Sequence, residues 1–202
     1  MTDTMIVSCI NKSYESILSV WYKSLMSLQN AKCVHVLEYT LTDDSFYRRL
    51  QIQFKQQKHI VLFKFAPSNE LIISRCSGSR QALMSLVYNY ARDLALKLSM
   101  YKYILFVEPN FILQWNTLSK LEEALESEQA DVASCMIYKN GEMQHGNFLN
   151  LDPNCRIPTQ DSKLIELIPR MFSSDKPNQV DWSTFGCFLI KRSVLRKINF
   201  RA

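Results

Sequence analysis

The segment that most constrains the fold is residues 101–110, which read YKYILFVEPN. Its continuous apolar run is bounded by polar residues, a pattern typical of a strand buried on both faces of a sheet. Ligands of open α/β sheets collect at the carboxyl ends of such strands, where Glu108 and Asn110 stand. Residues i and i+2 of an extended chain project to one side, and Pro109 favours extended geometry at Glu108. Both oxygens can therefore face one hard cation, although a surface glutamate before a Pro-Asn turn is the plainer alternative.

Strand and helix patterns alternate along the first half of the chain. Short apolar runs predict strands at residues 5–10, 33–39 and 59–65 and at the run around Tyr103. Apolar residues at helical spacing predict helices over residues 13–28 and 46–57, and a longer helix that opens at 77–79 and runs to Leu98. This repeated strand-helix order predicts an α/β fold.

The second half is less regular. The pattern predicts a helix at 118–128, strands at 131–138 and 143–151 joined by a hairpin turn at 139–142, a last strand at 185–190 and a helix from Arg192. Residues 152–176 are rich in Pro, Asn, Ser and Asp and are predicted to form a long functional loop with a short helix at 164–168.

Composition limits the class of protein. The 202 residues are 47% hydrophobic and 21% charged, which fits one globular domain over residues 1–202. The N-terminus is too short and polar for a signal peptide, and no stretch reaches the roughly 18 apolar residues of a membrane span. We therefore expect a soluble, cytoplasmic protein. Its six scattered cysteines indicate mostly reduced, buried thiols rather than a zinc site or a disulfide scaffold.

The net charge of +5 suits a polyanionic partner: a nucleotide diphosphate, a nucleic acid or an anionic membrane surface. Lys and Arg are spread along the chain without a basic stripe interleaved with aromatics, so no nucleic-acid partner is expected, while peripheral membrane contact stays open. The three histidines lie far apart without carboxylates at ligand spacing, which disfavours a zinc hydrolase. The chain has 4 glycines and no glycine-rich phosphate loop, which disfavours NAD or ATP binding of that type.

Several of these features occur in an order that resembles a known family. They are the first strand and helix, Glu38 at the end of the second strand, Ala91-Arg92-Asp93 before the 108–110 tripeptide, and Val180-Asp181-Trp182 leading into residues 186–192. Together they look like the GT-A glycosyltransferases, and the family-2-like branch in particular. The resemblance implies a GT-A, Rossmann-like fold: a mixed, mostly parallel sheet flanked by helices, with residues 1–110 as the nucleotide-binding half and residues 111–202 as the acceptor-binding half.

The implied activity is transfer of a sugar from a nucleotide-diphospho-sugar donor to a hydroxyl of a glycan, lipid or protein acceptor, assisted by a divalent cation. Glu108 and Asn110 match the two positions of the family's metal motif, with one carboxylate replaced by a neutral amide. Mn²⁺ or Mg²⁺ can be held by one carboxylate together with substrate phosphates and water. The departure therefore weakens metal binding in the absence of nucleotide without excluding catalysis.

Four residues are expected to contact the donor. Glu38 matches the carboxylate that contacts the base or ribose in the family, and Arg92 matches an arginine near the diphosphate, with a solvated helix charge as the alternative. Arg80 lies near the start of the same predicted helix, where the dipole and free N–H groups favour phosphate. The two arginines lie twelve residues apart, roughly 18 Å along a helix, so they cannot share one phosphate. Asn11, which follows the first strand, is grouped with the donor site, while Asp43 and Asp44 are expected to cap a helix.

An inverting transferase needs a carboxylate base at the acceptor hydroxyl. The candidates are Asp181 and Asp152, and Trp182 offers a flat face for a sugar ring. The family's later Glu-Asp pair has no match, which leaves the stereochemistry open. A nucleotidyltransferase, or a non-catalytic nucleotide- or nucleic-acid-binding module on the same fold, is the alternative.

Overall fold

A computed structural model of the chain describes residues 4–28, 33–40, 44–67, 79–98, 101–135, 138–139, 142–143 and 186–201. Six strands form one sheet in the order β3-β2-β1-β4-β8-β5. Their bounds are Thr4–Ile10 (β1), Val34–Glu38 (β2), Ile60–Lys64 (β3), Tyr103–Val107 (β4), Val132–Ser134 (β5) and Cys187–Lys191 (β8). The first four pair in parallel, and β8 runs antiparallel between β4 and β5. This mixed, mostly parallel sheet confirms the predicted α/β class.

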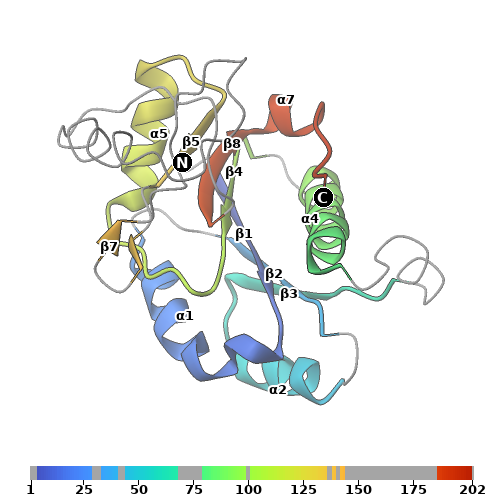
Figure 1. Cartoon of the computed structure of the whole chain (residues 1–202). Coiled ribbons are helices and arrows are strands. Elements are labelled where there is room, and N and C mark those ends of the chain that lie inside the picture. The colour runs from blue at the N-terminus through green and yellow to red at the C-terminus, as the bar shows by residue number, and fades with distance from the viewer. Residues whose placement is uncertain are drawn as a thin grey trace.

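Helices cover both faces of the sheet (Figure 1). One side carries α1 (Leu18–Ser27), α2 (Ser45–Phe54) and α5 (Thr117–Ser127), and the other carries α4 (Arg80–Leu98). The short α7 (Arg192–Leu195) leads into the C-terminal segment. No helix in the described ranges is both long enough and apolar enough to cross a membrane.

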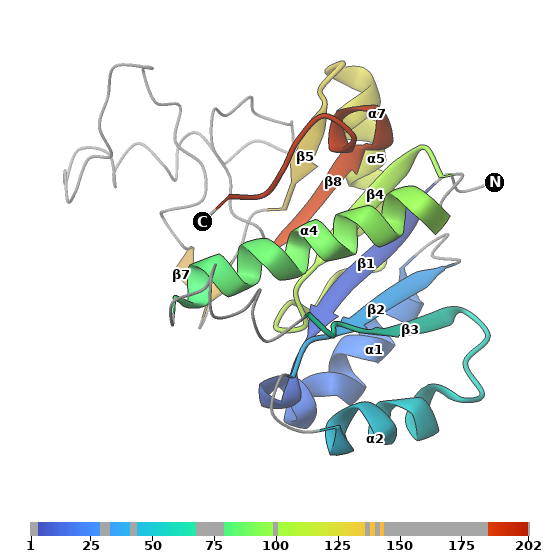
Figure 2. The ribbon, with the colours of Figure 1, turned by 90° about the vertical axis from the view of Figure 1, so that its right-hand side faces the viewer.

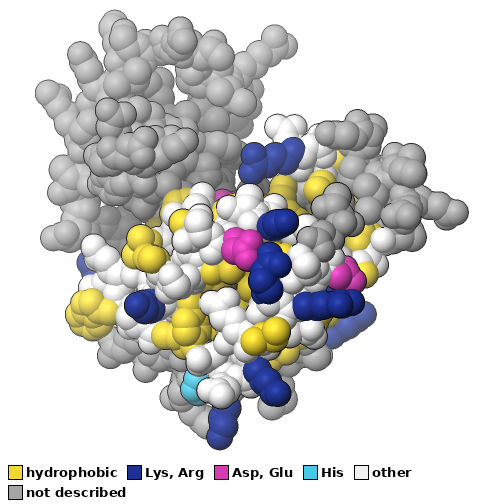
Figure 3. Space-filling view, turned by 90° about the horizontal axis from the view of Figure 1, so that it is seen from below, with side chains coloured by type: hydrophobic (Ala, Val, Ile, Leu, Met, Phe, Trp, Pro, Cys, Tyr) yellow, Lys and Arg dark blue, Asp and Glu magenta, His cyan; other side chains and the backbone are white. Residues whose placement is uncertain are grey.

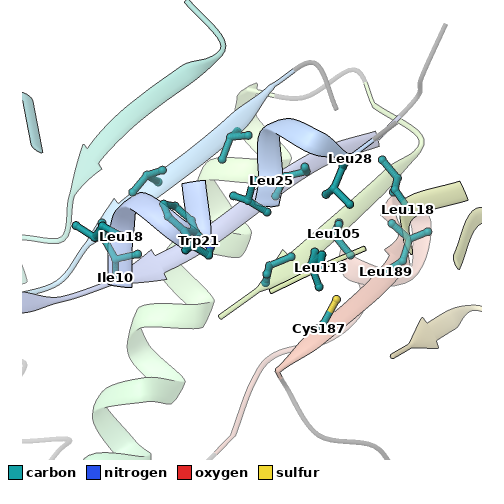
Figure 4. Close-up of a cluster of buried hydrophobic side chains, with 14 of the residues drawn as sticks. Ile10, Leu18, Trp21, Leu25, Leu28, Leu105, Leu113, Leu118, Cys187 and Leu189 are labelled. Atoms are coloured by element: carbon teal, nitrogen blue, oxygen red, sulfur yellow. The ribbon is translucent and has the colours of Figure 1, made fainter. Parts of the chain in front are cut away.

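The central strand β1 explains why the sheet needs two helical layers. All seven of its residues are buried. Ile6 and Ile10 belong to the apolar cluster under α1, α2 and α5, whereas Met5, Val7 and Cys9 belong to the cluster under α4. Successive side chains of a strand point to opposite faces, so a continuous apolar run requires cover on both sides. Figure 4 shows the first of these clusters between α1 and strands β1, β4 and β8.

The starts of two helices in the first half differ from the sequence prediction. The helix predicted at 13–28 begins as a 3₁₀ turn, η1 (Lys12–Ile17), before α1 starts. Asn11 caps that turn, since its side chain accepts a hydrogen bond from the Ser13 N–H. Asp44 stands before α2 as predicted but makes no side-chain cap bond; its carboxylate pairs with the ammonium of Lys64 instead.

In the second half, the predicted hairpin is confirmed: β6 (Tyr138–Lys139) pairs antiparallel with β7 (Glu142–Met143). The strand expected at 131–138 is shorter, because β5 ends at Ser134. The predicted loop at 152–176 lies outside the described residues. Four cysteines fall in the described ranges, and all are free: Cys9, Cys33, Cys135 and Cys187.

The C-terminal segment is fastened to the outer layer formed by α4. Asn89 donates to the Phe200 carbonyl at 2.8 Å and accepts from the Phe200 N–H at 2.9 Å. The Ser85 hydroxyl donates to the same carbonyl at 2.7 Å. One turn further on, the Arg92 guanidinium donates to the Ile198 carbonyl and to the Asn199 side chain. These bonds fix the position of α4 over the sheet.

We expect Asn89→Ala to lower the free energy of unfolding by about 1–3 kcal/mol, because the two hydrogen bonds between its side chain and Phe200 are each worth about 0.5–1.5 kcal/mol. Urea denaturation measures the change. The matched control is Lys97→Ala on the exposed side of the same helix, for which a change within about 0.5 kcal/mol is expected. Equal stability of the two variants would contradict the account of the C-terminal segment.

Candidate donor site at the carboxyl edge of the sheet

The strand order places a topological switch point between β1 and β4. From β1 the chain adds β2 and then β3 on one side, while β4 adds on the other. In open α/β sheets, ligands bind in the crevice outside the carboxyl ends of the strands at such a point. Figure 2 shows α4 crossing the sheet with its N-terminal end on the side to which the arrowhead of β1 points. The segments after β1, β2 and β4 and the start of α4 therefore form the candidate site.

The connections after β1 and β2 are bonded to each other. The Tyr39 N–H donates to the Ile10 carbonyl at 2.9 Å, and the Lys12 N–H donates to the Thr40 hydroxyl at 3.1 Å. The side chain of Asn11 caps η1: its Oδ1 accepts a hydrogen bond from the Ser13 N–H at 2.9 Å and another from the Ser13 hydroxyl at 2.5 Å. This part of the edge is thus ordered by the protein itself.

Glu38 has a role that the sequence prediction did not include. Its side chain is fully buried, and Oε1 accepts a hydrogen bond from the Thr40 N–H at 2.5 Å. Its carbonyl accepts from the Phe65 N–H at 2.7 Å, which joins the ends of β2 and β3. A buried carboxylate bonded to backbone N–H groups shapes the loop that carries it. In this structure Glu38 therefore orders the site's wall and presents no exposed surface to a base or ribose.

Glu108 stands at the end of β4 with its backbone held on two sides. Its N–H donates to the Gly186 carbonyl at 2.8 Å, just before β8, and its carbonyl accepts from the Phe111 N–H at 3.2 Å. Within this turn Glu108 is half-buried and Asn110 is exposed. The Glu108 carboxylate accepts a hydrogen bond from the Tyr88 hydroxyl of α4 at 3.2 Å. The predicted metal tripeptide thus lies on a fixed turn at the switch point.

Glu108 and Arg80, which carry opposite charges, both act on Tyr14 and Tyr39. Burial raises the pKa of Tyr14, the negative charge of Glu108 raises it further, and the positive charge of Arg80 lowers it. The pKa of Tyr39 is raised mainly by burial and is likewise raised by Glu108 and lowered by Arg80. Burial also raises the pKa of Tyr88 well above its ordinary value. These phenols therefore stay protonated at neutral pH and can donate hydrogen bonds, as Tyr88 does to Glu108.

The molecule is positively charged beside this edge. Seen from below, the face below α2 and η1 shows more Lys and Arg than acidic side chains (Figure 3). In η1 and before α2, Glu15 pairs with Arg49 at 2.8 Å, and Asp44 pairs with Lys64. A surface of this sign attracts polyanionic ligands and is screened by salt.

The two predicted arginines occupy different places. Arg80 is the first residue of α4 and is exposed, where the helix dipole and terminal N–H groups add to its charge. Arg92 lies twelve positions on, and its guanidinium binds Asp93, Ile198 and Asn199. Arg80 therefore stands at the start of α4, beside the carboxyl edge, whereas Arg92 is engaged with the C-terminal segment.

The 108–110 motif supplies only some of the ligands that a hard cation needs. Glu108 supplies one carboxylate and Asn110 one amide oxygen, both ligand types that Mg²⁺ and Mn²⁺ accept. No group of three or more His, Cys, Asp or Glu side chains arranged to hold a metal occurs within the described ranges. The set suits a cation whose remaining ligands are phosphate oxygens and water. Asp152, Asp181 and Trp182 lie outside the described residues.

Sequence reasoning missed the three tyrosines of the site, Tyr14, Tyr39 and Tyr88. On α4, Tyr88 is 7% exposed, whereas Tyr90, two positions further on, is 39% exposed. The spacing of Tyr88, Ala91 and Ala95, all buried, is the signal that marks the inner face, because small residues let a helix approach a sheet closely. For Tyr39, the only sequence feature that points to the site is its position directly after Glu38.

No protein-family model and no curated protein matches this sequence. Solved structures do match. The mannosyltransferase PcManGT from Pyrobaculum calidifontis, in complex with GDP-Man and Mn²⁺, superposes with a TM-score of 0.58 and 9% identity over 96% of this chain and 46% of that one. TarS residues 1–349 from S. aureus give 0.54 and 14% over 98% and 49%, and an active-site mutant of LgtC gives 0.52 and 12% over 97% and 60%.

TarS has also been solved in complex with UDP and with UDP-GlcNAc. The present chain spans about half the length of the TarS fragment and of PcManGT. Identities of 9–14% carry a statement about architecture and none about activity. The six-stranded sheet, its mixed pairing and these superpositions agree, and the chain has the GT-A fold that its sequence resembles.

Proposed function

We propose that this chain is a glycosyltransferase domain that uses a nucleotide-diphospho-sugar donor. The observation that carries the proposal is that Glu108, at the end of β4, and Arg80, at the start of α4, both act electrostatically on Tyr14 and Tyr39 beside the switch point of a GT-A sheet. Such an edge can hold a diphosphate by its charge. The donor complexes of TarS and PcManGT on the same fold support this reading.

In the proposed donor complex, Arg80 and the N-terminal end of α4 face the diphosphate. The helix is 19 residues long, so its dipole is fully developed at that end. The phenols of Tyr14 and Tyr39 lie within reach of the same charge and can donate to phosphate or sugar oxygens. Asn11 and Glu38 contribute by fixing the two connections against which the nucleotide lies.

Glu108 and Asn110 would hold the divalent cation, Mn²⁺ or Mg²⁺. When bound, this cation supplies positive charge to the leaving diphosphate. Arg80 adds positive charge that is already in place before reaction, which is the form in which electrostatic stabilisation is most effective. One carboxylate at the motif makes cation binding dependent on the nucleotide, because phosphate oxygens must complete the ligand set.

The acceptor side is proposed to come from residues 111–202. Asp181 or Asp152 removes the proton of the acceptor hydroxyl, and Trp182 packs on a sugar ring of the acceptor. The acceptor is a glycan, lipid or protein hydroxyl. The neutral amide of Asn110 favours one rival, a non-catalytic nucleotide-binding module on the same fold, which would bind the donor and transfer nothing.

We expect a nucleoside diphosphate to stabilise the fold, and Mn²⁺ to increase the effect. At a free concentration of 100 times the Kd, the free energy of unfolding rises by about 2.7 kcal/mol. Thermal shift and calorimetry with UDP, GDP and CDP, each with and without Mn²⁺, measure both effects. If none of these nucleotides binds at millimolar concentration, with or without Mn²⁺, the transferase proposal is wrong.

In the same assay Glu108→Ala should abolish the increase caused by Mn²⁺ while leaving the helical circular dichroism intact. The control is Glu123→Ala, which removes an exposed carboxylate from α5 and should leave both nucleotide binding and its Mn²⁺ dependence unchanged. A Glu108→Ala variant that keeps the full Mn²⁺ effect would place the cation elsewhere.

We expect either Asp181→Asn or Asp152→Asn to reduce sugar transfer about 10²- to 10⁴-fold while nucleotide affinity is retained, because asparagine keeps the shape and removes the proton acceptor. The other variant should lose stability with a smaller kinetic loss. Asp181 is favoured, since Trp182 follows it. Transfer at wild-type rates by both variants, measured with a donor that binds, would show that neither is the base.

A further inference from the structure

Tyr88 makes a contact that the donor-binding proposal leaves unused. It lies near the middle of α4, is 7% exposed, and its hydroxyl donates to Oε1 of Glu108 at 3.2 Å. Helix α4 and strand β4 belong to different layers, so this bond crosses from the helical layer to the end of a sheet strand. The one carboxylate of the predicted metal motif is therefore oriented by a side chain twenty positions earlier in sequence.

The Tyr88 ring is itself held in place. Its centroid lies 6.0 Å from that of Phe106 in β4 and 5.6 Å from that of Phe200. Phe200 is tied to α4 through Asn89 and Ser85. A ring packed on two sides and backed by a fastened segment keeps one rotamer, so its hydroxyl has a fixed position.

A hydroxyl at this position has a specific use. Phenylalanine would fill the same space among aromatic rings, and a buried hydroxyl without a partner is unfavourable. The backbone of Glu108 is already fixed by Gly186 and Phe111, so the remaining freedom lies in its side chain. A carboxylate that must be ordered upon binding loses rotamer entropy at that moment, whereas a carboxylate held beforehand does not.

We infer that Tyr88 is a positioning residue, which orients the Glu108 carboxylate for a divalent cation bound together with a nucleoside diphosphate. The inference rests on the proposed function. Because Asn110 contributes no negative charge, the direction of the Glu108 carboxylate decides how well the motif attracts a cation. Removal of a side chain that orients a metal ligand through a hydrogen bond typically lowers metal affinity about 10- to 100-fold. We expect a loss of about the same size when the Tyr88 hydroxyl is removed.

The test measures the affinity of the nucleoside diphosphate that binds wild type, with Mn²⁺ and with EDTA. Tyr88→Phe should reduce the Mn²⁺-dependent gain in affinity about 10-fold or more while the affinity in EDTA stays within about twofold, since phenylalanine preserves the packing. Tyr90→Phe is the matched control: it removes the hydroxyl of a 39% exposed tyrosine on the same helix and should change neither affinity.

A double-mutant cycle with Glu108→Gln separates positioning from folding. Glutamine keeps an acceptor for Tyr88 and removes the charge that binds the cation, so Tyr88→Phe should have no further effect on the Mn²⁺ gain in that background. An unchanged gain in Tyr88→Phe overturns the inference, and so does an equal loss of affinity with and without Mn²⁺, which marks a structural role alone. Wild type that binds no nucleoside diphosphate in any condition overturns the proposed function and, with it, this inference.

Discussion

Strand β1 is the element on which the rest of the structure depends. It pairs in parallel with β2 on one side and β4 on the other, and all seven of its residues are buried. A strand buried on both faces needs a helical layer on each, and parallel pairing sends the carboxyl ends of its neighbours to the same edge. The Ser8 hydroxyl donates to the Val107 carbonyl at 2.6 Å, which ties β1 to the residue before Glu108. The position of the candidate site follows from this pairing.

Helix α4 connects the carboxyl edge of the sheet with the C-terminal segment. Its first residue, Arg80, brings positive charge to the carboxyl edge, and Tyr88 reaches Glu108 from its inner face. Asn89 and Arg92 hold the C-terminal segment against the same helix. The helix therefore works as a rigid support: interactions far from the carboxyl edge set where Arg80 and Tyr88 lie. Loss of those interactions should displace Arg80 and Tyr88 without removing either side chain.

The sequence predicted the parts of this structure that depend on local pattern. Uninterrupted apolar runs identified β1 to β4, and the polar ending of the fourth run correctly placed Glu108 at the carboxyl end of β4. Local pattern could not show that β8 inserts antiparallel between β4 and β5, because pairing of strands about eighty residues apart depends on tertiary packing. It also could not show that Arg92 serves the C-terminal segment, since helical spacing gives the face of an arginine and not its partner.

Two further differences have a physical cause in burial. Glu38 ends β2 as predicted, but the sequence gives no sign that its carboxylate is enclosed and bonded to the Thr40 N–H. Tyr88 and Tyr90 are alike in type and differ by two positions, which turns them to different sides of α4. Tyr88 shares its side with the small residues Ala91 and Ala95, and its ring packs on Phe106 and Phe200 there. The rings that enclose Tyr88 come from β4 and from the C-terminal segment, so the local pattern of α4 does not contain them.

Hydrogen–deuterium exchange of the backbone amides, with and without a bound nucleoside diphosphate and Mn²⁺, tests most directly whether the carboxyl edge is the donor site. We predict slower exchange in residues 11–14, 39–40, 79–82 and 108–111, which surround the switch point, and no change in α5, which the proposed donor complex does not involve. Protection confined to other segments, with nucleotide shown to be bound, would contradict the assignment of this edge as the place where the donor binds.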